Sequence, residues 1–69
     1  MSCEEKTRLL QEYEAATARF SAAVTELHKR TPVSPVAEYG RLKRAAEEAR
    51  LNSERARLAL EHHTAVHGC

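Results

Sequence analysis

Apolar and polar residues alternate with the period of an α-helix in the first half of the chain. The apolar positions are separated by steps of three and four: Leu10, Tyr13, Thr17, Phe20, Val24 and Leu27. Three further positions flank this stripe and widen it: Leu9, Ala16 and Ala23. Such spacing gathers the apolar side chains on one face of a helix. We therefore predict a helix over residues 3–30, with this face turned towards a neighbour.

The second half of the chain repeats the pattern with smaller side chains. Its stripe comprises Tyr39, Leu42, Ala46, Ala49, Ser53, Ala56, Leu60 and His63. The pattern predicts a second helix over residues 35–67. Gly40 weakens its first turns by roughly 1 kcal/mol relative to alanine, and its lack of a side chain suggests close approach near the turn.

The two helical patterns are separated by a break over residues 31–35. Pro32 and Pro35 lie within this segment, and proline removes a backbone donor and clashes with the preceding turn of a helix. A connection this short folds the second helix back along the first. The predicted fold class is therefore all-α, an antiparallel two-helix hairpin that forms a single domain over residues 1–69.

The fold-back also sets an approximate register between the two helices. Counting outward from the break places the residues of the two stripes side by side as follows: Val24 and Leu27 near Tyr39 and Leu42, Phe20 near Ala46 and Ala49, and Tyr13 near Ser53 and Ala56. Large side chains of the first helix thus face small ones of the second, which favours close packing.

Residues with capping propensity stand at the predicted helix ends. Ser2, with Glu5 three residues later, has the spacing of a capping box. Ser34 is the expected N-cap of the second helix, with Pro35 at its first helical position. Gly68 is expected to end that helix in a left-handed conformation.

A second, weaker apolar stripe lies off the main one in the second helix. It contains Leu51 and Leu58, seven residues apart, together with Ala59 and Val66. A 69-residue chain buries little surface by itself. We therefore expect the hairpin to form a homodimer, a coiled-coil-like four-helix bundle, with these four residues at the interface with a partner.

Charge and composition exclude several classes of function. The net charge is +1, without the basic excess typical of proteins that bind phosphate backbones. Acidic residues alternate with the arginines, and Glu47–Arg50 and Glu54–Arg57 have the spacing of helical ion pairs. The start of the chain lacks the pattern of a signal peptide, and no apolar run is long enough for a membrane span. We expect a cytoplasmic protein without a membrane partner.

One cluster of residues has chemical potential, at the open end of the hairpin. The fold-back brings Cys3 close to His63, His67 and Cys69. Two histidines four residues apart on one helical face, with a thiolate, can hold a transition metal. The alternatives are a disulfide between Cys3 and Cys69 and histidines that only complement the helix dipole. A metal- or redox-responsive module is one hypothesis from this cluster.

No catalytic motif is present in the chain, so we expect neither an enzyme nor a cofactor. The favoured function is a small interaction or regulatory protein that packs its helices against itself or a protein partner.

A second functional hypothesis rests on a resemblance. A short hairpin that dimerises resembles the Rop-type RNA-binding regulators of plasmid copy number, and residues 5–9, Glu-Lys-Thr-Arg-Leu, are similar to the opening of that family. The resemblance implies RNA or another nucleic acid as a partner. The proline-bracketed turn departs from the family pattern, and no functional residue is carried over.

Overall fold

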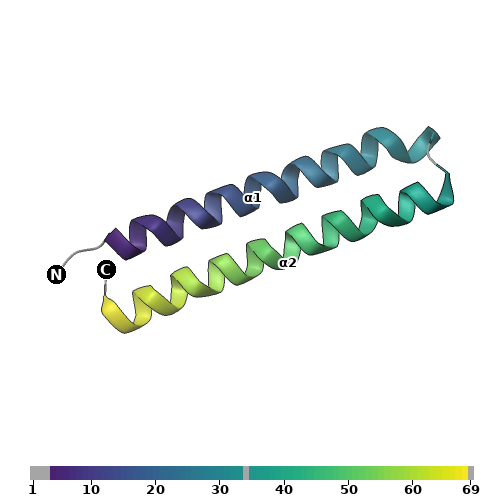
Figure 1. Cartoon of the computed structure of the whole chain (residues 1–69). Coiled ribbons are helices and arrows are strands. Elements are labelled where there is room, and N and C mark those ends of the chain that lie inside the picture. Colours follow the sequence, from purple (N-terminus) through teal and green to yellow (C-terminus); the bar gives the residue numbers. More distant parts are fainter. Residues whose placement is uncertain (1–3, 34, 69) are drawn as a thin grey trace.

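The chain forms two long helices joined by a tight connection. The computed structural model describes residues 4–33 and 35–68. Helix α1 spans Glu4–Arg30, a 3-10 turn (η1) spans Thr31–Val33, and helix α2 spans Val36–His67. The helices lie antiparallel and pack along their length, with the two ends of the chain at the same end of the molecule (Figure 1). The predicted all-α hairpin is confirmed.

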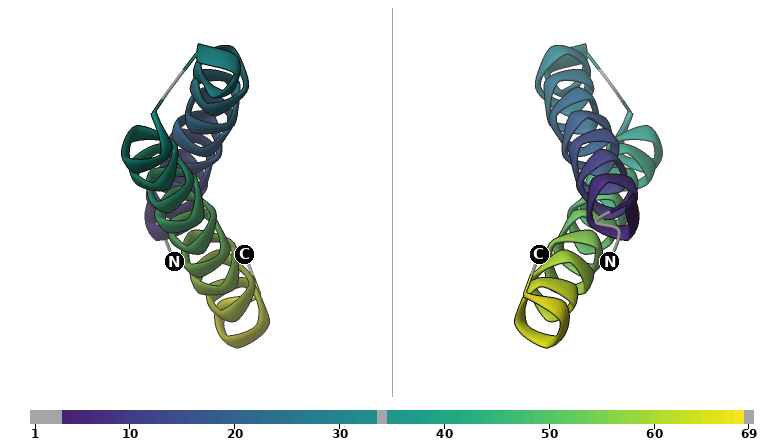
Figure 2. Two further views of the ribbon diagram at one scale, coloured as in Figure 1. Left: turned by 90° about the vertical axis from the view of Figure 1, so that its right-hand side faces the viewer. Right: turned by 90° about the vertical axis from the view of Figure 1, so that its left-hand side faces the viewer.

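The hairpin is long and thin. Its extents are 53 × 14 × 10 Å, and its radius of gyration is 15.7 Å. A compact domain of this length would have a radius of gyration of about 11 Å. The helices cross at a shallow angle, as the two end-on views show (Figure 2). The molecule is therefore only two helices thick, and every residue lies close to solvent.

The turn confirms the predicted break and corrects the start of the second helix. Pro35 has φ −61° and ψ 158°, an extended conformation, and its carbonyl accepts the N–H of Tyr39 at 3.0 Å. Pro35 is therefore the N-cap and not, as predicted, the first helical residue. The predicted caps Ser2 and Ser34 lie outside the described residues. Since Pro35 has no side-chain hydrogen bond to offer, the cap is made by backbone conformation alone.

Gly68 ends α2 as the sequence predicts. It has φ 70° and ψ 12°, and its N–H donates to the carbonyl of Thr64 at 2.9 Å. This left-handed conformation satisfies a carbonyl that the last helical turn would otherwise leave unpaired. The basic residues His28, Lys29 and Arg30 occupy the last turn of α1, where the helix dipole favours positive charge.

Two contacts fix the register of the hairpin. At mid-length, the hydroxyls of Thr17 and Ser53 lie 3.4 Å apart. Beside the turn, Arg30 donates to Glu38 at 3.0 Å. Both contacts agree with the predicted alignment, in which Tyr13 lies near Ser53 and Ala56, so the register is confirmed.

The packing face of α1 differs from the predicted stripe. The most buried side chains are Ala16, at 6% exposed, and Ala46, at 8%. Leu10 and Thr17, both predicted to face α2, are exposed. The other four members of the predicted stripe are half-buried, and the flanking residues Leu9, Ala16 and Ala23 are covered as well, so the contact line includes members of both sets.

The packing face of α2 agrees with the predicted stripe except at its start. From Leu42 to His63 its members are buried or half-buried, whereas Tyr39 beside the turn is 37% exposed. Gly40 also departs from expectation. A side chain added there would meet no atom within 4 Å, so the hairpin has no close approach at this glycine.

Candidate interaction surfaces

Apolar surface remains exposed on all sides of the isolated hairpin. Among the described residues, only Ala16 and Ala46 form the buried core, and no large side chain is fully buried. The accessible surface is 5138 Å². A compact protein of this mass would expose about 4300 Å². The hairpin therefore has surfaces suited to contact with another chain, and they fall into three regions.

The first region is the outer stripe of α2, which consists of Leu51, Leu58, Ala59 and Val66. Leu51 is 44% exposed, Leu58 54% and Val66 61%. Leu51 precedes Ser53, which contacts α1, by two residues, so it lies on nearly the opposite side of the helix. All four predicted interface residues are open to solvent, and Leu51 and Leu58 point away from α1.

The second region is one broad side of the hairpin, here called the Thr17 face. On α1 it carries a shallow hollow of ≈ 440 Å³ lined by Tyr13, Glu14, Thr17, Ala18 and Ser21. Leu10 and Val24 lie seven residues, or two helical turns, before and after Thr17, and therefore on the same side of α1. Apart from Glu14, this strip of α1 has no charge.

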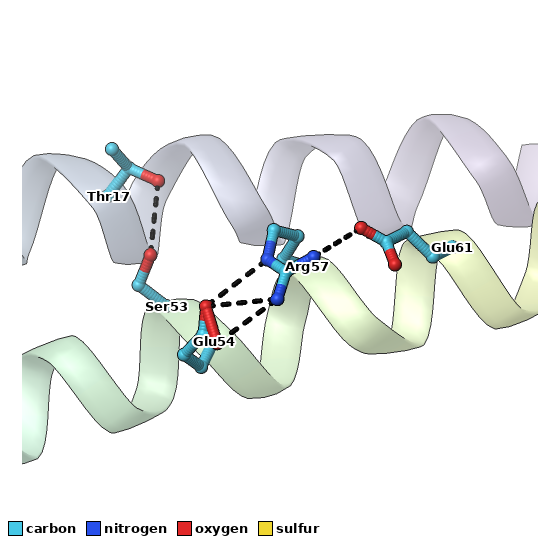
Figure 3. A network of polar contacts seen from close by, with 5 residues as sticks. All are labelled: Thr17, Ser53, Glu54, Arg57 and Glu61. Atoms are coloured by element: carbon cyan, nitrogen blue, oxygen red, sulfur yellow. Dashed lines mark hydrogen bonds and ion pairs between the residues drawn. The ribbon is translucent and has the colours of Figure 1, made fainter.

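Helix α2 borders the Thr17 face with six alternating charges. Basic and acidic residues follow one another at steps of four and three, here called the charge row: Lys43, Glu47, Arg50, Glu54, Arg57 and Glu61. Figure 3 shows part of this row beside the contact between Thr17 and Ser53, with Arg57 extended between its two acidic partners.

Ion pairs within the helix hold the charge row in place. Arg57 pairs with Glu54 at 3.1 Å and also with Glu61, and Arg50 pairs with Glu47 at 3.5 Å. The two ion pairs predicted by spacing are therefore confirmed. The hydrogen bond from Arg57 lowers the pKa of Glu54 below its ordinary value, and the same bond raises the pKa of Arg57. Both shifts favour the ionised forms of Glu54 and Arg57.

The third region is the opposite broad side. A smaller hollow of ≈ 180 Å³ lies between the helices there, lined by Ala16, Arg19, Ala45, Glu48, Ala49 and Asn52. On α2 this side carries fewer charges than the charge row, with Ala45 and Asn52 on either side of Glu48. Nearer the start of α1, Arg8 forms ion pairs with Glu5 and with Glu12, the latter at 2.8 Å.

The structure brings together two of the four predicted metal ligands. The rings of His63 and His67 have their centroids 4.6 Å apart and are tilted by 38°. Nε2 of His63 is buried and has no hydrogen-bond partner. Cys3 and Cys69 lie outside the described residues. Within residues 4–33 and 35–68, no three potential ligands are close enough to hold a metal ion.

The start of α1 and the end of α2 lie at the same end of the hairpin (Figure 1). The pKa of Glu5 is lowered, mainly by its hydrogen bond from Arg8 and to a smaller degree by His63 and His67. The start of α1 and the end of α2 therefore influence one another electrostatically.

Comparison with known proteins adds no functional information. The chain matches no protein family, no curated protein and no solved structure. In the described part of the chain, neither helix has the length and apolarity needed to cross a membrane.

Sequence reasoning recognised two ion pairs of the charge row but missed the row as a surface. The sequence did not show which side of α1 the row lies beside. The contact between Thr17 and Ser53 places the row next to the strip of α1 that contains Thr17. The available signal was the seven-residue repeat of both signs: Lys43, Arg50 and Arg57, and Glu47, Glu54 and Glu61.

Proposed function

We propose that this chain is a small non-enzymatic interaction protein that acts by packing its helices against itself or a protein partner. The observation that carries this proposal is the burial pattern. A hairpin whose buried core consists of Ala16 and Ala46, among the described residues, leaves its large apolar side chains half-buried or exposed. Covering such surface is the main source of free energy in protein association.

The outer stripe of α2 supplies the anchors for a protein partner. Leu51 and Leu58 project from the side of α2 away from α1, two turns apart, and each is about half exposed. A partner groove or helix can receive two such side chains without disturbing the hairpin, because neither of them holds the two helices together. This is the arrangement by which a helix commonly binds in an apolar groove.

Affinity capture with matched variants tests this proposal. The wild-type chain is expected to retain a specific protein from cell extract, and the double variant Leu51→Glu, Leu58→Glu is expected to lose it. A control variant, Asn52→Glu with Arg55→Glu, places two acidic residues beside the stripe and should retain the protein. Circular dichroism checks that all three chains keep the same helix content.

The proposal is overturned by a different set of results. These are a folded monomer at micromolar concentration that captures no specific protein, together with tight RNA binding that weakens steeply as salt increases. Such an outcome would instead support the nucleic-acid function suggested by the resemblance to Rop-type regulators.

A further inference from the structure

We propose that the Thr17 face binds a second copy of this chain, in a two-fold dimer with the two turns at opposite ends. The inference rests on the proposed function and names one partner, this chain itself. The two-fold axis crosses both helices near mid-length, so that α1 lies over α1 and α2 over α2, each pair antiparallel. The interface is then the same surface on both copies.

The charge row of α2 is complementary to itself in this arrangement. Reversing the row about the height of Asn52 places Lys43 opposite Glu61, Glu47 opposite Arg57, and Arg50 opposite Glu54. Each of the six charges thus faces an opposite charge on the second copy, and none faces a like charge. The side chains of Arg50 and Glu54 are 50% and 46% exposed, which leaves them available for such contacts.

The strip of α1, which is uncharged apart from Glu14, is also matched by the same rotation. Reversal about Thr17 places Leu10 against Val24, Tyr13 against Ser21, and Thr17 against its own counterpart. Large side chains therefore meet smaller ones across the interface. Leu10 is 42% exposed in the isolated hairpin and would be covered.

The centre of the α1 strip and the centre of the charge row lie at nearly the same height along the hairpin. The α1 strip is centred on Thr17, which contacts Ser53, and the charge row is centred on Asn52, the adjacent residue. The offset is one residue, about 1.5 Å along a helix. A single axis can therefore satisfy both helices at once, although the two sequence patterns are unrelated.

The size of the face suits a dimer. Extents of 53 and 14 Å define a face of about 740 Å². Standard interfaces bury about 800 Å² on each partner. The face is thus large enough for a dimer when its whole length is used, as the antiparallel arrangement does.

The other ways of stacking two hairpins lack this complementarity. With both turns at the same end, α1 of one copy lies over α2 of the other, and the charge row faces the uncharged strip. Its six charges would be partly dehydrated without gaining partners. On the opposite broad side, charged residues of α2 occur only at every seventh position, Arg41, Glu48 and Arg55, with Ala45 and Asn52 between them, so that side offers fewer charge pairs.

Charge reversal tests the interface. An acidic variant carries Lys43→Glu, Arg50→Glu and Arg57→Glu, and a basic variant carries Glu47→Lys, Glu54→Lys and Glu61→Lys. We expect light scattering to show that the wild-type chain is a dimer at micromolar concentration. Each variant alone should dissociate about 100-fold more readily, because like charges then oppose one another across the interface. An equimolar mixture should restore a heterodimer, although the ion pairs within each helix remain broken.

A control variant has the same net charge as the acidic variant but different positions. Arg41→Glu, Arg44→Glu and Arg55→Glu alter α2 away from the Thr17 face, and this chain should remain dimeric. It should also fail to bind the basic variant. Binding between these two chains would mean that net charge alone drives association, and it would overturn the proposal.

A cross-link tests the topology without relying on the folding of the charge variants. In a chain with Cys3→Ser and Cys69→Ser, Thr17→Cys is expected to give a disulfide-linked dimer on mild oxidation. The control Ala15→Cys, on another side of α1, should stay monomeric under denaturing electrophoresis. With both turns at the same end, Thr17 would face Ser53 of the second copy, and the cross-link would not form.

The outcomes separate this inference from the proposed function. A wild-type chain that is monomeric at micromolar concentration, or an acidic variant that is still dimeric, overturns the inference. If such a chain still binds a protein through Leu51 and Leu58, the proposed function stands. If a monomeric wild-type chain also captures no protein, both fail.

Discussion

Ala16 and Ala46 are the most buried of the described residues, although Ala16 was predicted only to flank the packing stripe of the first helix. Phe20 and Tyr13, the bulkiest side chains on the packing face of α1, are only half-buried. A hairpin without further layers can cover just one side of an aromatic ring. Ala16 and Ala46 are almost completely covered because a small side chain at the helix contact needs little surface to cover it.

Gly40 offers a direct test of the described packing. Since a side chain there would meet nothing within 4 Å, Gly40→Ala is expected to stabilise the hairpin. Alanine is favoured over glycine within a helix by about 1 kcal/mol. That gain corresponds to an increase in Tm of roughly 4–8 °C for a domain of this size. Thermal and urea unfolding, followed by circular dichroism, measure the effect.

Gly68 is the matched control for that substitution. Its φ of 70° is a conformation that alanine adopts only with strain. Gly68→Ala is therefore expected to lower the stability, opposite in sign to the change at Gly40. A loss of stability in Gly40→Ala would show that another chain packs against this glycine.

The ion pairs of Glu5 and Glu54 make stability depend on acid pH. Both carboxylates have a pKa below the ordinary value of 4.5, because Arg8 and Arg57 stabilise their charged forms. A lowered pKa contributes stability that is fully present above the ordinary pKa and is lost as the pH falls through the lowered value. We expect Tm to be level near neutral pH and to decrease below pH 4.5.

The double variant Glu5→Gln, Glu54→Gln provides the comparison for this pH dependence. It should start with a lower Tm at neutral pH and lose less on acidification than the wild-type chain. Equal losses in the two chains would contradict the assignment of the pH dependence to these carboxylates.

At the scale of the helices, the contact line between α1 and α2 depends on alanine at the buried positions. Ala46→Leu adds volume where the helices are closest, and overpacking of this kind typically costs about 1–3 kcal/mol. We expect a corresponding decrease in the urea midpoint. Ala15→Leu adds the same volume on an exposed side of α1 and should change the stability by less than about 0.5 kcal/mol.

An Ala46→Leu chain as stable as the wild type would show that the helices can separate to accept the side chain. In that case the buried alanines would reflect sequence composition and not a packing requirement.

The sequence predicted the face of α2 better than that of α1, for a physical reason. Between Leu42 and His63, adjacent apolar candidates in α2 occur at Ala45–Ala46 and Ala59–Leu60, and elsewhere the periodicity selects the face. In α1, alternate layers hold adjacent pairs of candidates, such as Leu9 with Leu10 and Ala16 with Thr17. Spacing cannot choose within a pair, and the choice depends on which side chain fits against α2.

The start of α2 shows the same limit at a single residue. Two prolines predicted the break correctly, but the conformation of Pro35 decides whether it begins the helix or precedes it. Its extended ψ of 158° places it before the helix. Composition indicates that a helix stops or starts, whereas the backbone dihedrals determine the residue.

At the scale of the whole molecule, the fold could be predicted from sequence and the candidate surfaces only in part. The fold depends on contacts within one chain, and the two apolar patterns encode them. The exposed outer stripe of α2 was also evident, through Leu51 and Leu58. The Thr17 face was not, because it combines an uncharged strip and a charge row that lie far apart in sequence. A metal site at the open end depends on Cys3 and Cys69, beyond the described residues.

The position of both chain ends at one end of the hairpin determines how the protein would respond to mechanical force (Figure 1). A load applied between Glu4 and Gly68 would act across the helix contacts one layer at a time, starting at His63. The layers would open in sequence, and the turn at residues 31–35 would open last. A load between the turn and either end would instead act along a helix axis. The two helices would therefore separate at low force when the load is applied between the two ends of the hairpin. They would resist a higher force when the load is applied between the turn and either end.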